Sequence, residues 1–229
     1  MNIRFHGHAC VQLTDGNGRS VIIDPFLSGN GMATVEAKDI HVDYVLLTHG
    51  HGDHIADAAD IAKRCEAEVV ATPELAGYIG QSGAKTVGMN LGGTYRTPFA
   101  SFKMVQAFHS SSVTGEDGLP VYMGMPAGFL IEMDGRTILH AGDTALFGDM
   151  RLIGERHNID VAFLPIGDHF TMGPEDAAVA AEWLKAKIVV PIHFNTFPPI
   201  RQNPEDFLGM LRERDIRGKI LQPGEEWAL

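Results

Sequence analysis

The sequence predicts an α/β fold, on three observations. Short apolar runs rich in Val and Ile alternate along the whole chain with longer stretches of helical periodicity. Three of those stretches open with the proline favoured in a first helical turn, at Pro73, Pro174 and Pro204. The chain has 229 residues, of which 45% are hydrophobic, and nothing in it has the composition of a linker or a repeat. Residues 1–229 are therefore expected to form a single domain around one sizeable core.

The individual elements follow from local patterns. Apolar, β-branched runs between turn residues predict strands at 3–5, 9–13, 21–24, 42–47, 68–71, 102–107, 128–133, 137–140, 161–165, 188–191 and 219–221. Helical spacing predicts helices at 55–65, 73–79, 174–185 and 204–214. Residues 110–126 are rich in Ser, Gly and Pro and predict a loop over a site. The runs 42–47 and 159–164 are similar, as counterparts in two halves of a layered fold would be.

Charge and composition exclude several classes of protein. The formal net charge is −11, which argues against general nucleic-acid binding, although a local basic or metal-lined cleft could still accept an anion. Cys10 and Cys65 form no C-x-x-C pair and are interpreted as small buried hydrophobic residues. Neither a secretory leader pattern nor an apolar stretch of about 18 residues is present. A cytoplasmic protein without membrane association is therefore expected.

A dense group of metal-binding side chains follows the predicted strand 42–47. Residues 48–54 are Thr-His-Gly-His-Gly-Asp-His, which places His49, His51, Asp53 and His54 within one turn of chain. The glycines allow a tight bend, so two imidazoles can converge on one metal while the last two side chains face a second one. Nitrogen and carboxylate ligands suit zinc, manganese or iron. The alternative is a polar loop of solvated histidines, which would require four metal-competent side chains to coincide at a strand end.

Three further candidate ligands stand just past predicted strands. His109 follows strand 102–107, Asp143 follows strand 137–140, and His193 follows strand 188–191. Strand ends are where α/β sheets present their functional side chains. Taken singly, an Asp after Gly is usually a turn residue and an isolated His is usually structural. Taken with residues 48–54, they complete two coordination shells.

With these residues, the chain resembles the metallo-β-lactamase superfamily over its whole length. The resemblance rests on T-H-x-H-x-D-H at residues 48–54, the single His109, Gly-Asp-Thr at 142–144 and the late His193, in the superfamily's order. It implies a four-layer αββα sandwich with the site at the sheet edges. The ligands that it implies are His49, His51 and His109 for one metal, Asp53, His54 and His193 for a second, and Asp143 as the bridge.

Further segments resemble a prokaryotic group of uncharacterised metal-dependent hydrolases, related to ascorbate-6-phosphate lactonase and to N-acyl-phosphatidylethanolamine-hydrolysing phospholipase D. They are residues 7–8, 23–26, 164–167, 170–174 and 191–199. Exported antibiotic-hydrolysing members are disfavoured because no signal peptide is visible, and flavin-linked di-iron members because they carry Glu where His51 stands. Ribonuclease Z members are disfavoured because no basic arm is inserted. The resemblance supplies no substrate, since this fold hosts many chemistries.

The expected mechanism follows from two adjacent cations. Ions on the order of 3.5–4 Å apart lower the pKa of a shared water, polarise a carbonyl or phosphoryl oxygen and stabilise the leaving oxygen. Asp53 and Asp143 are the expected catalytic carboxylates, because the first can accept a hydrogen bond from the nucleophile and the second joins the ions. The prediction is a hydrolase of a small lactone, ester or phosphodiester, with two divalent ions, zinc as first choice and manganese as second.

Four more residues are expected around the ligands. His8, Asp24 and His140 lie beside strand ends and could orient ligating histidines, which usually need a partner on their second nitrogen. The alternative for them is a turn cap before Pro25 and two packed or solvated histidines. His169 follows strand 161–165 and could bind a substrate anion or protonate a leaving oxygen, or be a solvated loop residue.

Two other functions stay open. One is a non-catalytic metal-binding or scaffold protein that has kept the fold, and the other is a nuclease-type phosphodiesterase. The complete set of histidines and carboxylates favours catalysis, because structural zinc sites are closed, four-coordinate and usually contain Cys. The expected partner is a small-molecule substrate. The sequence leaves open the substrate, the native metal, any general acid and whether the chain forms a homo-oligomer.

Overall fold

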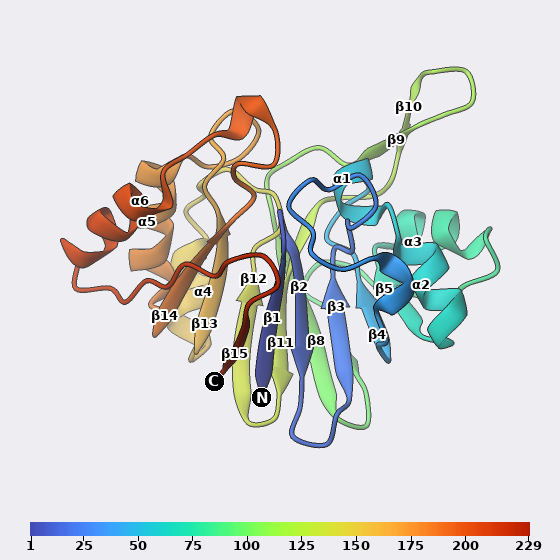
Figure 1. Ribbon diagram of the computed structural model, residues 1–229, viewed down its shortest axis with the longest axis horizontal. Coiled ribbons are helices and arrows are strands. Elements are labelled where there is room, and N and C mark those ends of the chain that lie inside the picture. The colour runs from blue at the N-terminus through green and yellow to red at the C-terminus, as the bar shows by residue number, and fades with distance from the viewer.

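Two β-sheets lie face to face in the centre of the computed structural model, which describes residues 1–229 (Figure 1). The first sheet has seven strands in the order β15-β1-β2-β3-β4-β5-β6, and the second has six in the order β14-β13-β12-β11-β8-β7. The strands of the first sheet are β1 Asn2–Gly7, β2 Cys10–Thr14, β3 Ser20–Ile23, β4 Tyr44–Leu46, β5 Glu68–Ala71, β6 Lys85–Gly88 and β15 Glu226–Ala228. Those of the second are β7 Thr94–Arg96, β8 Ala100–Gln106, β11 Ala127–Met133, β12 Arg136–His140, β13 Val161–Pro165 and β14 Ile188–Ile192.

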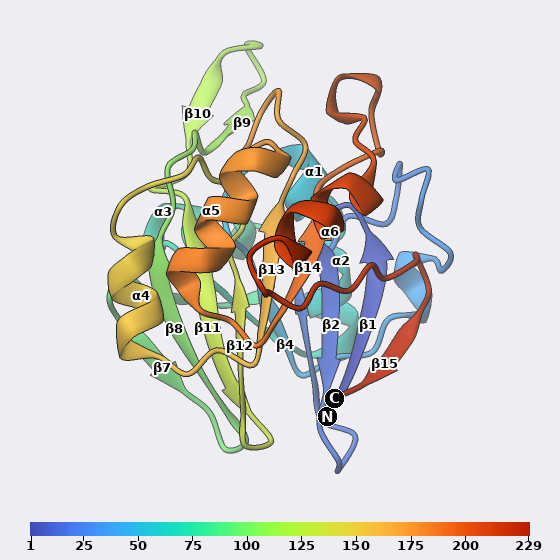
Figure 2. The same cartoon turned by 90° about the vertical axis from the view of Figure 1, so that its left-hand side faces the viewer.

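Helices cover the outer faces of both sheets, as the two views at right angles show (Figures 1 and 2). The helices are α1 Gly52–Ile55, α2 Ala58–Cys65, α3 Pro73–Gly80, α4 Met150–Arg156, α5 Pro174–Leu184 and α6 Pro204–Arg212. Short 3-10 turns occur at Ala37–Asp39 and Pro198–Ile200. None of the helices combines the length and the apolar character that a membrane crossing requires.

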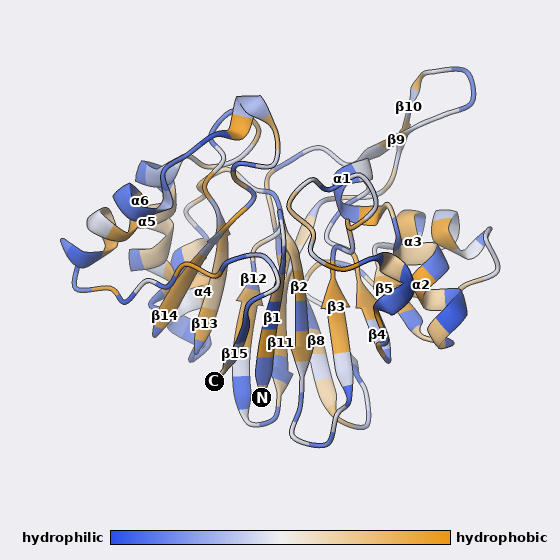
Figure 3. Cartoon of the chain, viewed as in Figure 1, coloured by the Kyte–Doolittle hydropathy of each residue, from blue (hydrophilic) through white to orange (hydrophobic).

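Three separate apolar layers hold the sheets and helices together. Strand β11 shows why: Phe129 and Ile131 point into the layer between the sheets, whereas Leu130 points into the layer under α4, α5 and α6. The first sheet has the same alternation, because Leu46 faces the other sheet and Val45 packs under α2 and α3. Strands buried on both faces are apolar throughout, which Figure 3 shows in orange. The expected four-layer αββα sandwich is confirmed.

Each sheet is antiparallel on one side and parallel on the other. In the first sheet β3, β4, β5 and β6 run parallel, and in the second β12, β13 and β14 do so. The runs 42–47 and 159–164 hold corresponding places, since β4 follows β3 and β13 follows β12. Parallel strands end at a common edge, and loops there present side chains to one another.

The structure differs from the predicted elements at several points. The predicted strand 219–221 is wrong, because the chain makes only a single bridge from Gly218 to Val189 before it turns away. The predicted helix 55–65 is divided into α1 and α2. Between them, the Asp57 carboxylate accepts hydrogen bonds from the amides of Leu27 (2.7 Å) and Ser28 (2.8 Å) and ties down that loop. Residues 110–126 contain a hairpin of β9 Ser112–Thr114 and β10 Pro120–Tyr122, which projects beyond the sandwich (Figure 1).

Candidate metal centre

The candidate ligands come together at the edge where the parallel strands end. They and the supporting Asp24 are delivered by loops that follow five different strands of the two sheets. Asp24 follows β3, residues 48–54 lead from β4 into α1, His109 follows β8, Asp143 follows β12 and His193 follows β14. All seven sequence-predicted ligands are thereby brought to one place.

A buried carboxylate lies at the centre of this group. Asp143 is only 3% exposed, and its Oδ2 atom faces imidazole nitrogens from both sheets. The distances from Oδ2 are 3.0 Å to Nε2 of His193, 3.3 Å to Nε2 of His54, 3.5 Å to Nε2 of His109 and 3.9 Å to Nε2 of His49. Asp143 therefore touches both halves of the site.

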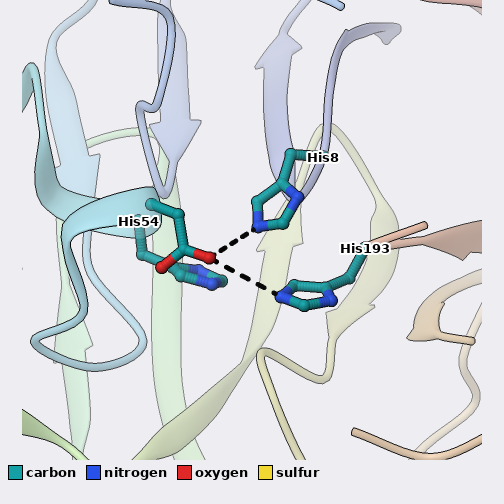
Figure 4. Close-up of side chains that lie close together, drawn as sticks. His8, His54 and His193 are labelled. Atoms are coloured by element: carbon teal, nitrogen blue, oxygen red, sulfur yellow. Dashed lines mark hydrogen bonds and ion pairs between the residues drawn. The ribbon is translucent and has the colours of Figure 1, made fainter. Parts of the chain in front are cut away.

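The remaining side chains form two neighbouring groups, each with ligand atoms within 4.8 Å of one another. One group is His49, His51 and His109, in which Nε2 of His49 lies 2.9 Å from Nδ1 of His51. The other is His8, Asp53, His54 and His193. Figure 4 shows the three histidines of the second group converging. Oδ2 of Asp53 lies 3.1 Å from Nε2 of His8 and 4.0 Å from Nε2 of His193.

Hydrogen bonds fix the direction of two of these imidazoles. The Asp24 carboxylate accepts from the Thr48 amide (2.8 Å), the Thr48 hydroxyl (2.7 Å) and Nδ1 of His54 (2.8 Å). Because the Thr48 hydroxyl donates to Asp24, it accepts from Nδ1 of His49 at 2.9 Å. Both histidines therefore carry a proton on Nδ1 and direct Nε2 into the site, the orientation that a partner on the other nitrogen gives to metal-binding histidines.

His8 makes direct hydrogen bonds to two candidate ligands, Asp53 and His193. Its Nε2 donates to Oδ2 of Asp53 at 3.1 Å, its Nδ1 accepts from the Thr196 hydroxyl at 2.9 Å, and its carbonyl accepts from the His193 amide at 2.7 Å. His8, Asp24 and His193 also have positive φ angles of 57°, 49° and 55°. Such backbone strain in non-glycine residues persists where surrounding contacts over-determine the conformation, commonly at functional sites.

His140 and His169 take different places. The ring of His140 is fully buried, with Nε2 donating to the Ala9 carbonyl at 2.8 Å and Nδ1 accepting from the Gly142 amide at 3.2 Å. It thus supports the turn before Asp143 rather than touching a candidate ligand. His169 is exposed, its ring packs edge to face on Phe170, and no hydrogen bond or ion pair joins it to the cluster.

Gly142 brings the two sheets into close contact at the site. Its φ angle is +63°, and a Cβ atom there would lie 2.6 Å from the Ala127 carbonyl and 2.9 Å from Cβ of Thr48. Only glycine fits this position. The turn carrying Asp143 is therefore held directly against the segment that carries the first four candidate ligands.

The ionisation of the cluster suits cation binding. Burial lowers the pKa of His8 to about 4 and that of His49 well below its usual value. Burial opposes ionisation of Asp143, but His193 and His54 outweigh it and hold the Asp143 pKa well below the usual range. For His54, burial is outweighed by the Asp143 and Asp24 carboxylates, which raise its pKa. A divalent cation would take the place of that proton, since metal binding releases protons from its ligands.

Two buried polar atoms test whether the donor set fits metal ions. Nε2 of His54 and Oδ1 of Asp143 are buried and have no hydrogen-bond partner. Leaving such atoms unsatisfied costs on the order of 1–3 kcal/mol each, so natural structures seldom tolerate them. An imidazole nitrogen and a carboxylate oxygen are both good ligands for zinc and manganese. The residues present therefore fit divalent cations.

With this geometry in view, sequence comparison identifies the family. Residues 19–194 match the β-lactamase superfamily domain. A UPF0173 metal-dependent hydrolase from Geobacillus thermodenitrificans is 57% identical over 225 residues, covering 98% of both chains. The chain belongs to the UPF0173 metal-dependent hydrolases of the metallo-β-lactamase superfamily. A relative of the same name from Staphylococcus carnosus is 51% identical over 229 residues, covering 99% of this chain and 98% of its own.

A solved structure supports the same assignment for this metallo-β-lactamase fold. The metallo hydrolase Igni18 from the archaeon Ignicoccus hospitalis superposes with a TM-score of 0.88 and is 33% identical. The match covers 100% of this chain and 98% of that one. The fold and the enzyme class thus agree with the resemblance found in the sequence.

Three supporting residues were missed by the sequence reasoning. The hydroxyl of Thr48 links Asp24 to His49, the Ser110 hydroxyl lies 3.2 Å from Nε2 of His51, and the Thr196 hydroxyl contacts His8. The available signals were the Thr directly before the first motif histidine and the run of serines after His109. Thr196 gave no signal, because its contact spans 188 residues of sequence.

Proposed function

We propose that this hydrolase uses two divalent cations, zinc as first choice and manganese as second, to hydrolyse a small lactone, ester or phosphodiester. His49, His51 and His109 would hold one ion, Asp53, His54 and His193 the other, and Asp143 both. The observation that carries the proposal is the buried Asp143 carboxylate, within 3.0–3.9 Å of histidines from both groups. A carboxylate between two imidazole clusters matches a bridging ligand better than a single-ion site.

When bound, the cations would supply a hydroxide nucleophile at neutral pH and polarise the oxygen of the scissile group. The protein's own residues divide the other tasks by exposure. The Asp53 side chain is 29% exposed, whereas that of Asp143 is 3% exposed. Asp53 is therefore the carboxylate that can accept a hydrogen bond from an attacking water, while Asp143 supplies buried charge. His8 keeps Asp53 in position through the 3.1 Å hydrogen bond.

The alternative of a non-catalytic metal-binding protein fits the site less well. Structural zinc sites are closed and usually include Cys, but none of the potential metal groups here contains one. The edge of the site is also partly open, since His51, Asp53 and His109 are only half-buried. A nuclease-type phosphodiesterase is less supported too, because no Lys or Arg lines the hollow beside His109.

The proposal is tested by screening metal-replete protein against three substrate sets: lactones, carboxylic esters including thioesters, and phosphodiesters. Turnover is expected in one set with zinc or manganese present, and its loss is expected after chelation or in the Asp143→Asn variant. Retention of both metals without turnover in any set would favour the non-catalytic alternative. Turnover of phosphodiesters alone, including nucleic acids, would favour the nuclease.

A further inference from the structure

A hollow of about 480 Å³ opens directly beside the candidate metal centre. Its floor begins at His109 and continues through the serines that follow it, Ser110 and Ser112. Its walls include Pro120, Tyr122 and Met125 from the other side of the hairpin. This volume lies within the range of about 300–1,000 Å³ that small-molecule pockets occupy.

The β9–β10 hairpin turns one defined face toward this hollow. Tyr122 pairs with Ser112 across the two strands, and Val121 pairs with Val113. Cross-strand partners share a face and successive residues alternate, so the Tyr122 face lines the hollow and the Val113 face looks the other way. Val113 packs against the apolar layer under α2 and α3. Val113 thus anchors one face of the hairpin to the protein, and the opposite face, with Tyr122, is free to contact a ligand.

The base of the hairpin is fixed to the site. The Met123 amide donates to the Ser111 carbonyl at 3.0 Å, and the Thr72 hydroxyl donates to the Met123 carbonyl at 3.0 Å. The Met123 side chain is buried against Gly50, where an added Cβ would lie 2.5 Å from it. Gly50 stands between His49 and His51, so the hairpin base is packed against the metal-binding loop itself. The wall is therefore held in place relative to the reacting atoms.

The chemistry of the walls is apolar and hydroxylic, without a charged side chain. Tyr122 is 61% exposed and Met125 is 52% exposed, so both present apolar surface that a ligand in the hollow can cover. The charges nearby are negative, with Glu74 beside Gly124 and with Glu116 and Asp117 at the hairpin tip. The walls therefore offer apolar contact and hydroxyl groups, but no cationic side chain, to the part of a ligand that lies away from the metal centre.

We propose that this hollow is the specificity pocket of the enzyme and binds an uncharged, largely apolar substituent of an ester or lactone substrate, such as an alkyl or aryl chain. The inference rests on the proposed hydrolysis at the adjacent metal centre, and it names the substrate class within it. A phosphate or carboxylate at the far end of this substituent would find no cationic side chain among the lining residues to pair with. Tyr122 and Met125 are the specificity-determining residues.

Binding without hydrolysis tests the pocket independently of the reaction. N-hexylacetamide is neutral and resists hydrolysis, and N-methylacetamide has the same amide group without the long chain. Calorimetric titration of the metal-replete protein is expected to show N-hexylacetamide binding at least about tenfold more tightly than N-methylacetamide, because only the longer chain reaches the apolar walls. The Tyr122→Ala variant is expected to weaken N-hexylacetamide binding about fivefold or more, through loss of apolar contact. Leu119→Ala is the matched control, since Leu119 is equally exposed on the same hairpin but does not line the hollow.

Hydrolysis gives the second readout. With p-nitrophenyl esters from acetate to hexanoate, kcat/KM is expected to rise about twofold to fourfold per methylene until the hollow is filled. Tyr122→Ala and Met125→Ala should flatten this rise while leaving metal content unchanged, and Leu119→Ala should preserve it. Equal binding of the two amides, or equal effects of Tyr122→Ala and Leu119→Ala, would overturn the pocket. Selective binding of N-hexylacetamide without turnover of any ester, lactone or phosphodiester would instead contradict the proposed function while leaving the apolar pocket in place.

Discussion

The two halves of the molecule contribute to the metal centre in different ways. In the N-terminal half, one loop after β4 carries four candidate ligands within residues 49–54. In the C-terminal half, β8, β12 and β14 each deliver one, namely His109, Asp143 and His193. The halves have corresponding topology, with an antiparallel part followed by parallel strands, so the difference lies in the loops and not in the sheets.

The two halves also differ in how many of their buried candidate-ligand atoms have hydrogen-bond partners. In the N-terminal half, the outward nitrogens of His49, His51 and His54 have partners in Thr48, Ser110 and Asp24. In the C-terminal half, Oδ1 of Asp143 and Nδ1 of His193 are buried without a partner. The N-terminal half thus orients its imidazoles through the protein's own hydrogen bonds and leaves only the site-facing Nε2 of His54 without a partner, whereas in the C-terminal half the outward Nδ1 of His193 has none.

The largest effect is expected from Asp143→Asn, which keeps the shape but removes the charge that offsets two cations. The second metal equivalent should bind at least about 100-fold more weakly and hydrolysis should fall in parallel, with the fold retained. Metal titration and turnover measure this. The control is Asp160→Asn in the same half, where the carboxylate accepts from Lys187 (2.7 Å) and Thr137 (2.9 Å) away from the site. Unchanged metal content and activity in Asp143→Asn would remove the bridging assignment.

A smaller effect is expected from Asp24→Asn in the N-terminal half. The amide can place a donor opposite the donors of Thr48 and His54, which disturbs the tautomers of His49 and His54 without removing a candidate ligand. Metal affinity should fall about 10-fold to 100-fold, the range for residues that orient metal ligands. Competition with a chelator of known affinity measures it. An affinity equal to wild type would show that the N-terminal half is not organised through Asp24.

The pH dependence of the stability of the metal-free protein tests the role of His140, which supports the turn before Asp143 in the C-terminal half. Burial lowers the pKa of His140 below its usual value of 6.5. Below about pH 6.5 the unfolded chain takes up a proton that folded His140 does not, so this residue's contribution to stability is complete at higher pH and is lost as the pH falls. His140→Asn, which can still donate to the Ala9 carbonyl, should flatten this loss by up to about 1.4 kcal/mol per pH unit.

Urea unfolding between about pH 5 and pH 7.5 measures this slope, with the metals removed by chelation. The control is His41→Asn, since the ring of His41 is exposed on the surface of the protein. Parallel slopes for wild type and His140→Asn would show that His140 takes up its proton equally in the folded and unfolded chains.

The smallest effect is expected at His169, which the structure leaves exposed beside Phe170. If it hydrogen-bonds the substrate, His169→Asn should keep metal content and turnover within about twofold, while His169→Ala should raise KM by about threefold to tenfold. Steady-state kinetics with the substrate found by screening gives both values. A collapse of kcat in His169→Asn would instead make His169 the general acid.

The same contrast between the halves explains what the sequence could predict. The loop 48–54 could be predicted because its candidate ligands are adjacent in sequence. The buried strands could be predicted because both of their faces are apolar. The strand β15 and the edge strands β6 and β7 were missed, since they are three or four residues long and partly exposed. The division between α1 and α2 depends on Asp57 binding a loop 30 residues away, which no local pattern records.

The residues and segments that hold the candidate ligands in place were harder to predict than the candidate ligands themselves. Asp24 was expected near them from its place after a strand, but its three hydrogen bonds need β3 and β4 side by side. The hairpin was expected only as a loop because its strands are short and its residues polar or exposed. Local chemistry thus identified which residues could bind metal, and only the packing of both sheets showed what holds them.

The metal stoichiometry of the purified chain tests the central claim most directly. Protein prepared without chelator and reconstituted with zinc or manganese should reach two equivalents per chain by elemental analysis, with hydrolysis appearing as the second equivalent binds. The first equivalent should change the N-terminal half little, because its hydrogen bonds are already in place. A firm plateau at one equivalent, with full activity, would contradict the dinuclear site and the bridging role of Asp143.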